Sequence, residues 1–129
     1  MGKSSRTILI IDDSETNLVL LDLVLKARGW IIQTANSAKL GMKMINVSKP
    51  DLILLDLLMP GIDGQEMLNR LKSDDSLSHI PVIIVSAVTD SKVRKDCLDK
   101  GAVYYMPKPV NIPELIEIIQ NTFDKCAAD

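Results

Sequence analysis

Several apolar segments of this sequence are each followed by a side chain suited to metal or phosphoryl chemistry. Asp12 and Asp13 follow the first such segment, and Asp56, Ser86 and Lys108 follow later ones. Carboxylates held close together repel, and a hard divalent cation such as Mg²⁺ relieves the repulsion by taking oxygen ligands. One carboxylate could then attack a phosphoryl group to form an acyl phosphate. A hydroxyl and an ammonium could stabilise the transferring oxygens.

Each of these residues also has an ordinary structural interpretation. Adjacent acids before a helix are commonly a solvated N-terminal cap. Taken alone, Asp56 could be a turn residue, Ser86 could satisfy the backbone, and Lys108, between two prolines, could be a surface lysine. The chemical interpretation is favoured because all of them are expected at the same end of four strands.

The segments that position these residues are predicted to be strands. Short, continuous apolar runs are typical of strands buried on both faces of a parallel sheet. The runs cover Thr7–Ile11, Trp30–Thr34, Asp51–Leu55, Pro81–Val85 and Val103–Met106.

Between the runs lie longer segments whose apolar residues recur at helical spacing. The five predicted apolar stripes are Leu18, Leu21, Val24 and Leu25; Leu40, Met44 and Val47; Met67, Leu68 and Leu71; Val93, Cys97 and Leu98; and Ile112, Leu115, Ile116, Ile119 and Phe123. Capping residues are predicted at Ser14, Asp63 and Asn111, and helix ends at Gly29 and Gly101.

Alternation of strand and helix five times predicts an α/β fold. We expect an open, five-stranded, doubly wound parallel sheet with helices on both faces, of the flavodoxin-like type. In such sheets ligands bind outside the carboxyl ends of the strands, where the acids, Ser86 and Lys108 are expected.

Length and charge limit the classes of function. A chain of 129 residues is the size of one domain, expected over residues 7–124 with flexible ends at 1–6 and 125–129. The 15 basic and 17 acidic side chains give a net charge of −2, so direct binding to nucleic acid or a membrane surface is not expected.

The cysteines and the N-terminal segment predict a cytoplasmic location. Cys97 and Cys126 form no CxxC motif and are interpreted as incidental thiols of a reduced protein. Thr7–Ile11 is too short for a signal sequence or a membrane span.

The sequence resembles the receiver domains of bacterial two-component response regulators over residues 7–124. The resemblance rests on Ile-Ile-Asp-Asp-Ser at 10–14, Asp-Leu-Ile-Leu-Leu-Asp-Leu-Leu-Met-Pro-Gly-Ile-Asp-Gly at 51–64, Pro-Val-Ile-Ile-Val-Ser-Ala at 81–87 and Gly-Ala-Val-Tyr-Tyr-Met-Pro-Lys-Pro at 101–109.

The resemblance implies a phosphoacceptor site with Mg²⁺ as its cofactor. It implies that Asp56 accepts the phosphoryl group. Asp13, Asp56 and the backbone carbonyl of Leu58 would bind Mg²⁺ directly, and Asp12 would act through a metal-bound water.

Roles for the remaining site residues follow from the same resemblance. Ser86 would donate a hydrogen bond to the phosphoryl group, and Lys108 would pair with one of its oxygens. The bond between Lys108 and Pro109 is expected to be cis. Tyr105 would be the switch aromatic that turns inward when Ser86 moves; the alternative is a half-buried strand residue with a solvated hydroxyl.

Partners are likewise implied. A sensor histidine kinase or a histidine phosphotransfer protein would donate the phosphoryl group in a phosphorelay. The face formed by the fourth helix, fifth strand and fifth helix would then control an output domain, a separate protein or a phosphorylation-dependent homodimer. Such a domain catalyses its own phosphorylation and the hydrolysis of its acyl phosphate, without the turnover of a conventional enzyme.

The sequence departs from many relatives at three positions. Leu58 and Val88 are apolar where many relatives have a polar residue, which predicts slow hydrolysis of the acyl phosphate because the attacking water is poorly placed. Tyr104 adds an aromatic ring to the expected output face and could mark a protein contact or be an ordinary exposed tyrosine.

Alternative functions lack their sequence features. A receiver-like interaction module that works without phosphorylation would be expected to lack an acid, the acceptor or the lysine, and none is missing. A flavodoxin-like cofactor binder needs a phosphate loop in place of Asp12 and Asp13. The Asp-x-Asp signature of aspartyl phosphatases and the P-loop are both absent, and the lone histidine, His79, is predicted to be solvated.

Overall fold

The computed structural model describes residues 6–59 and 63–128. The expected flexible N-terminal segment 1–6 therefore lies outside the described residues except for Arg6, as do residues 60–62 of the motif at 51–64 and residue 129.

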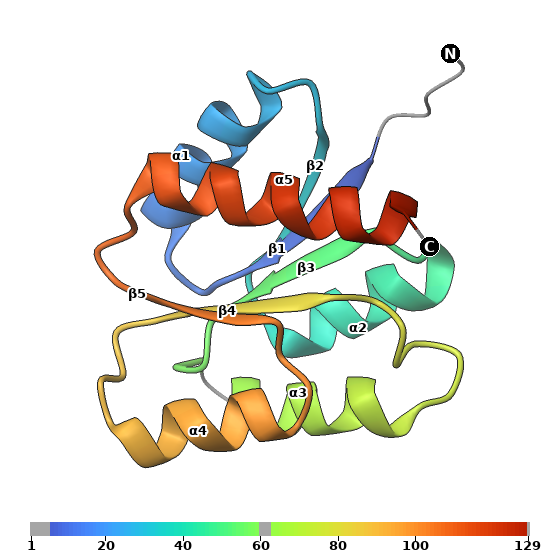
Figure 1. Cartoon of the computed structure of the whole chain (residues 1–129), viewed down its shortest axis with the longest axis vertical. Coiled ribbons are helices and arrows are strands. Elements are labelled where there is room, and N and C mark those ends of the chain that lie inside the picture. The colour runs from blue at the N-terminus through green and yellow to red at the C-terminus, as the bar shows by residue number, and fades with distance from the viewer. Residues whose placement is uncertain (1–5, 60–62, 129) are drawn as a thin grey trace.

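Five parallel strands form one sheet, as the apolar runs predicted. They are β1 (Thr7–Ile11), β2 (Ile31–Ala35), β3 (Leu52–Leu55), β4 (Val82–Ser86) and β5 (Tyr104–Pro107). Their order is β2-β1-β3-β4-β5, and every neighbouring pair is parallel (Figure 1). The predicted α/β fold with a doubly wound sheet is confirmed.

Helices cover both faces of the sheet (Figure 1). They are α1 (Glu15–Lys26), α2 (Ala38–Val47), α3 (Gly64–Ser73), α4 (Ser91–Asp99) and α5 (Ile112–Ala128). Alternate strand residues face opposite layers. One core layer packs strand residues such as Ile10 and Leu54 against α1 and α5, and the other packs residues such as Ile11 and Ile53 against α2, α3 and α4.

Side-chain caps and glycines bound the helices as predicted. Ser14, Asp63 and Asn111 accept hydrogen bonds from the backbone N–H three residues ahead, at 3.3, 2.8 and 3.0 Å. Gly29 and Gly101 follow α1 and α4 with φ of 94° and 115°, a conformation that side chains with a Cβ rarely adopt. Both helix ends therefore depend on glycine.

Four strands begin one residue later than predicted. The apolar runs predict that these strands begin at Trp30, Asp51, Pro81 and Val103, but each of these residues lies directly before its strand. Pro81 has no N–H to give to a ladder, and the Asp51 side chain accepts a hydrogen bond from Thr7 N at 2.7 Å. The fourth strand also ends one residue later than predicted, so Ser86 is the last residue of β4 and does not follow it.

The predicted apolar face of α2 is wrong. Val47 is 87% exposed and Leu40 is 40% exposed, whereas Ala38, Gly41 and Ile45 are buried. A Cβ at Gly41 would lie 2.6 Å from the Ile11 Cδ1. The helix therefore presents small residues to β1. Leu40 and Val47 lie toward solvent, whereas Met44, the third residue of the predicted stripe, is partly buried against the core.

The C-terminal helix is longer than expected. We placed a flexible end at 125–129, but α5 continues to Ala128. No glycine or proline follows Phe123, and the buried Phe123 ring keeps this part of α5 on the sheet. None of the described helices combines the length and apolar character needed to cross a membrane.

Candidate functional site

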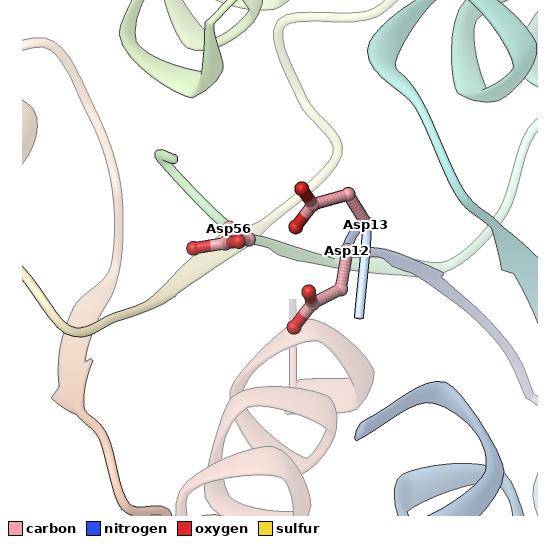
Figure 2. A group of neighbouring side chains, drawn as sticks. All are labelled: Asp12, Asp13 and Asp56. Carbon is pink, nitrogen blue, oxygen red and sulfur yellow. The ribbon is translucent and has the colours of Figure 1, made fainter. Parts of the chain in front are cut away.

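Three carboxylates meet at the carboxyl end of the two central strands. Asp12 directly follows β1 and Asp56 directly follows β3, and these strands pair with Ile11 opposite Leu55. One oxygen from each of Asp12, Asp13 and Asp56 lies within 4.8 Å of the others. Figure 2 shows the three side chains beside one another at the ends of their strands. Asp12 and Asp56 are only 2% and 4% exposed, whereas Asp13 is exposed.

Hydrogen-bond donors of the protein engage both oxygens of Asp12. Its Oδ1 accepts from Ser14 N at 2.8 Å. Its Oδ2 accepts from Asn17 Nδ2 at 3.1 Å and from Lys108 Nζ at 3.0 Å. Asp12 is thus held in one orientation by the start of α1 and by Lys108.

Lys108 brings a positive charge to the carboxylates from the carboxyl end of β5, the edge strand of the sheet. It follows β5, and its Nζ lies 3.0 Å from Asp12 Oδ2 and 3.6 Å from Asp56 Oδ2. Its side chain is 19% exposed. Its backbone N–H donates to the carbonyl of Ser86 at 2.9 Å, and the Lys108–Pro109 bond is cis.

Burial and neighbouring charge favour the protonated form of Asp56. Withdrawal from water is the main cause of its raised pKa, and the negative charge of Asp12 adds to it. Lys108 acts in the opposite direction, as does the N–H of Leu58, which donates to Asp56 Oδ1 at 3.3 Å. One lysine therefore does not fully offset the clustered negative charge.

The donor set fits a hard divalent cation. Three carboxylates supply only oxygen ligands, which Mg²⁺ prefers, and Mg²⁺ is commonly held by one or two carboxylates together with waters. The exposed Asp13 leaves a side open to solvent. A cation here would also lower the raised pKa of Asp56, because positive charge favours the carboxylate.

Ser86 and Tyr105 are linked through the segment that follows β4. Ser86 is fully buried, and its Oγ accepts a hydrogen bond from Val88 N at 3.1 Å. Tyr105 is 5% exposed, and its hydroxyl donates to the carbonyl of Val88 at 2.7 Å. The alternative of a half-buried tyrosine with a solvated hydroxyl is therefore wrong in this structure. Burial raises the pKa of the Tyr105 phenol.

The three positions that depart from many relatives differ in exposure. The Leu58 side chain is 57% exposed, and Val88 is half-buried. Tyr104 is also half-buried, and its hydroxyl donates to Glu114 Oε2 at 2.7 Å. Tyr104 is thus tied to α5 and is not a freely exposed aromatic residue.

Two site residues were missed in the sequence. Asn17 donates to Asp12, but nothing in its spacing distinguishes it from other polar residues in a first helical turn. Gly64 is the first residue of α3. Because glycine is a poor helix former, its presence there is the sequence feature that could have indicated a close contact. A Cβ at Gly64 would collide with the Asp56 carbonyl oxygen and would lie 2.6 Å from Leu57 Cα.

Comparison with known proteins points to one family. The model of the family described as "Response regulator receiver domain" matches residues 8–120. The polar-differentiation response regulator DivK of Brucella anthropi is 33% identical over 117 residues, which are 90% of this chain and 94% of DivK.

Two further relatives agree. The response regulator PleD of Caulobacter vibrioides is 36% identical over 107 residues, 83% of this chain but only 24% of PleD, so this chain matches about a quarter of that protein. A CheY-like response regulator receiver domain protein from Methanospirillum hungatei superimposes with a TM-score of 0.89 and 28% identity, covering 95% of this chain and 96% of that one.

Proposed function

We propose that this chain, which belongs to the family of response regulator receiver domains, accepts a phosphoryl group on Asp56 and thereby controls a partner. The observation that carries the proposal is the convergence of Asp12, Asp13 and Lys108 on the buried Asp56. The carboxylates of such a cluster repel one another, and a bound cation would relieve that repulsion and attract the negatively charged phosphoryl group.

In the proposed reaction, a carboxylate oxygen of Asp56 attacks the phosphorus of the donor. The new O–P bond forms as the bond between phosphorus and the donor breaks, and the electron pair of that bond leaves with the donor. Lys108, 3.6 Å from Asp56, supplies positive charge to the transferring oxygens, and Ser86 supplies a hydroxyl. We assign the donor to a sensor histidine kinase or a histidine phosphotransfer protein.

Asp13, Asp56 and the backbone carbonyl of Leu58 would hold Mg²⁺, with Asp12 acting through a water. When bound, the ion supplies positive charge to the carboxylates and to the phosphoryl oxygens. Asp12 is well suited to an outer position, because Ser14, Asn17 and Lys108 already engage its oxygens.

Output is proposed to pass through Ser86 and Tyr105. The segment after β4 carries both the Ser86 hydroxyl and the Val88 carbonyl that holds Tyr105, so a shift of Ser86 toward a phosphoryl group would strain the tyrosine's hydrogen bond. The face of α4, β5 and α5 would then favour an output domain, another protein or a second copy of this chain. A cytoplasmic location and a single receiver domain that begins at residue 7 and ends with α5 belong to the same proposal.

The test is phosphorylation by a small phosphodonor. The wild-type chain is incubated with acetyl phosphate and Mg²⁺, and its intact mass is measured alongside Asp56→Asn and Asp75→Asn, the latter an exposed acid outside the cluster. We expect one phosphoryl group on the wild type and on Asp75→Asn and none on Asp56→Asn. An unmodified wild type that still folds would favour an interaction module independent of phosphorylation.

We also propose slow loss of the phosphoryl group. The Leu58 N–H contacts Asp56, so this residue stands beside the acyl phosphate with an apolar side chain that cannot orient water. Leu58→Asn is expected to shorten the lifetime of the phosphoryl group several-fold, as followed by mass after removal of the donor. An unchanged lifetime in Leu58→Asn would contradict this proposal.

A further inference from the structure

A second concave site lies at the opposite end of the sheet from Asp56. Pro81 directly precedes β4 and Val103 directly precedes β5, so both belong to the amino end of the strands. Together with the last turns of α5 and the segment between α3 and β4, they line a half-open cavity of about 390 Å³. Its volume lies within the range of small-molecule sites, about 300–1,000 Å³.

The charged side chains that line this cavity are two lysines, Lys72 from α3 and Lys125 from α5. His79 lines it as well, and no aspartate or glutamate does. Neither lysine forms an ion pair with any residue that the structure describes. In a chain whose net charge is −2, these two lysines give the lining of the cavity a local excess of positive charge.

Lys72 is held by backbone hydrogen bonds, and none of the described carboxylates pairs with its positive charge. Its Nζ donates to the carbonyls of Ser78 and Ile80 at 3.0 and 2.8 Å. Its aliphatic stem crosses the turn at Gly101, where a Cβ would lie 3.3–3.4 Å from it. Backbone dipoles therefore satisfy two of the three ammonium protons, and burial lowers the pKa of Lys72. An anion at the cavity would offset that cost of burial.

The remaining wall offers apolar surface. Pro81, Val103 and Ile118 line the cavity, and Val103 is 48% exposed. Because large β-branched side chains gain free energy when they leave water, an apolar body would be favoured here. Apolar wall and cationic rim together match a ligand with one apolar part and one negative group.

We propose that this cavity binds a small organic carboxylate with an apolar body. The carboxylate would face Lys72 and Lys125, and the apolar body would lie against Val103, Pro81 and Ile118. The site is separate from the phosphoryl chemistry, because the two lie at opposite ends of the 5-residue strand β4, whose ends are about 13 Å apart.

The test uses 2-naphthoate as the probe and neutral 2-naphthamide as its matched control. Backbone amide shifts of the full chain are followed by NMR during titration with each. We expect saturable shifts around Val103 and Thr122 with naphthoate, and affinity for naphthamide weaker by about tenfold, because a paired charge is worth about that factor in a partly buried site. Equal affinity for the two probes, shifts clustered around Asp12 and Lys108, or no saturation would overturn the proposal.

Variants then assign the binding to the cavity. Lys125→Gln is expected to weaken naphthoate about fivefold, whereas Lys39→Gln, an exposed lysine on α2, leaves it unchanged. Val103→Glu introduces a negative charge into the wall and should abolish binding while the amide spectrum stays folded. Asp56→Asn should bind naphthoate like the wild type, so failure of the phosphoryl proposal would leave this one standing. Unchanged affinity in both Lys125→Gln and Val103→Glu would show that the lysines serve only the fold.

Discussion

The two ends of the sheet each hold a lysine that is largely withdrawn from solvent, and the two are satisfied differently. Lys108, at the carboxyl end, lies against the carboxylates of Asp12 and Asp56. Lys72, at the amino end, donates to the backbone carbonyls of Ser78 and Ile80. One lysine is surrounded by too much negative charge, and the other has only dipoles around it.

This difference shows that a chain with a small net charge can still place acidic and basic side chains at opposite ends of its sheet. A net charge of −2 gave no electrostatic reason to expect direct binding to nucleic acid or a membrane surface. Folding nevertheless gathers three acids at one end and basic side chains around a cavity at the other. Each end is therefore expected to respond to an ion of the opposite sign.

Glycine substitutions give the largest contrast between the ends. Gly64→Ala should destabilise the fold by about 3 kcal/mol or more, because its Cβ meets the backbone of Asp56 and Leu57, which cannot yield cheaply. Gly101→Ala should cost about 1 kcal/mol, the strain of a positive φ, because its Cβ meets only the flexible stem of Lys72. Urea unfolding measures both. Equal losses would mean that the carboxyl end is not the more rigid one.

Removal of the two lysine charges tests the comparison directly. Without divalent cations, Lys108→Met should cost about 2–3 kcal/mol, because it leaves two buried carboxylates without their cation. Lys72→Met should cost about 1–2 kcal/mol, since two carbonyls lose a donor. Addition of Mg²⁺ should recover part of the loss in Lys108→Met and none in Lys72→Met, as measured by urea unfolding. Recovery in both would erase the distinction.

The pH dependence of Asp56 sharpens the picture of the carboxyl end. Its pKa is raised in the folded protein, so folding favours the protonated form. The stability that this group contributes is present below its ordinary pKa of 3.8 and is lost as pH rises through the raised value. In a chelator at pH 7, Asp56→Asn should therefore melt a few degrees higher than the wild type, and the difference should shrink toward pH 4. A lower melting temperature for Asp56→Asn at pH 7 would show that Lys108 more than compensates the cluster.

A substitution at the first residue of β5, outside both sites, provides the baseline and the smallest effect. Tyr104→Phe removes only the hydrogen bond to Glu114 and should cost about 0.5–1 kcal/mol by thermal unfolding. It should leave both phosphoryl uptake and naphthoate binding unchanged. A change at either end would indicate that β5 couples the two sites.

Most of the fold could be predicted because the inner strands β1, β3 and β4 are buried on both faces. The edge strand β2 does not follow that prediction, since Ile31 is 49% exposed. Continuous apolar runs such as Ile8–Ile11 have no other stable location in a small domain, and the capping residues marked the helices between them. The convergence of Asp12, Asp56 and Lys108 followed from the rule that parallel strands end at one edge. No periodicity was needed for that inference.

Contacts between distant side chains could not be predicted in the same way. No local sequence pattern predicts that Asn17 on α1 donates to Asp12. None predicts that Lys72 donates to backbone carbonyls of the segment before β4. The face of α2 was mistaken because hydropathy favours Leu40 and Val47, whereas close packing on Ile11 demands Gly41. Steric fit between elements overrode the hydrophobic pattern there.

The pairing of β1 with β3 also fixes the distance between the backbone positions of Asp12 and Asp56. Asp56 N donates to the carbonyl of Ile11 at 2.9 Å, so the first residues beyond both strands stay in step. The gap between the two carboxylate-bearing positions is then set by the interstrand spacing, about 4.8 Å, and not by the side chains around them. Substitution of nearby surface residues therefore leaves that distance unchanged, whereas replacement of either aspartate by glutamate would add a methylene and crowd the site.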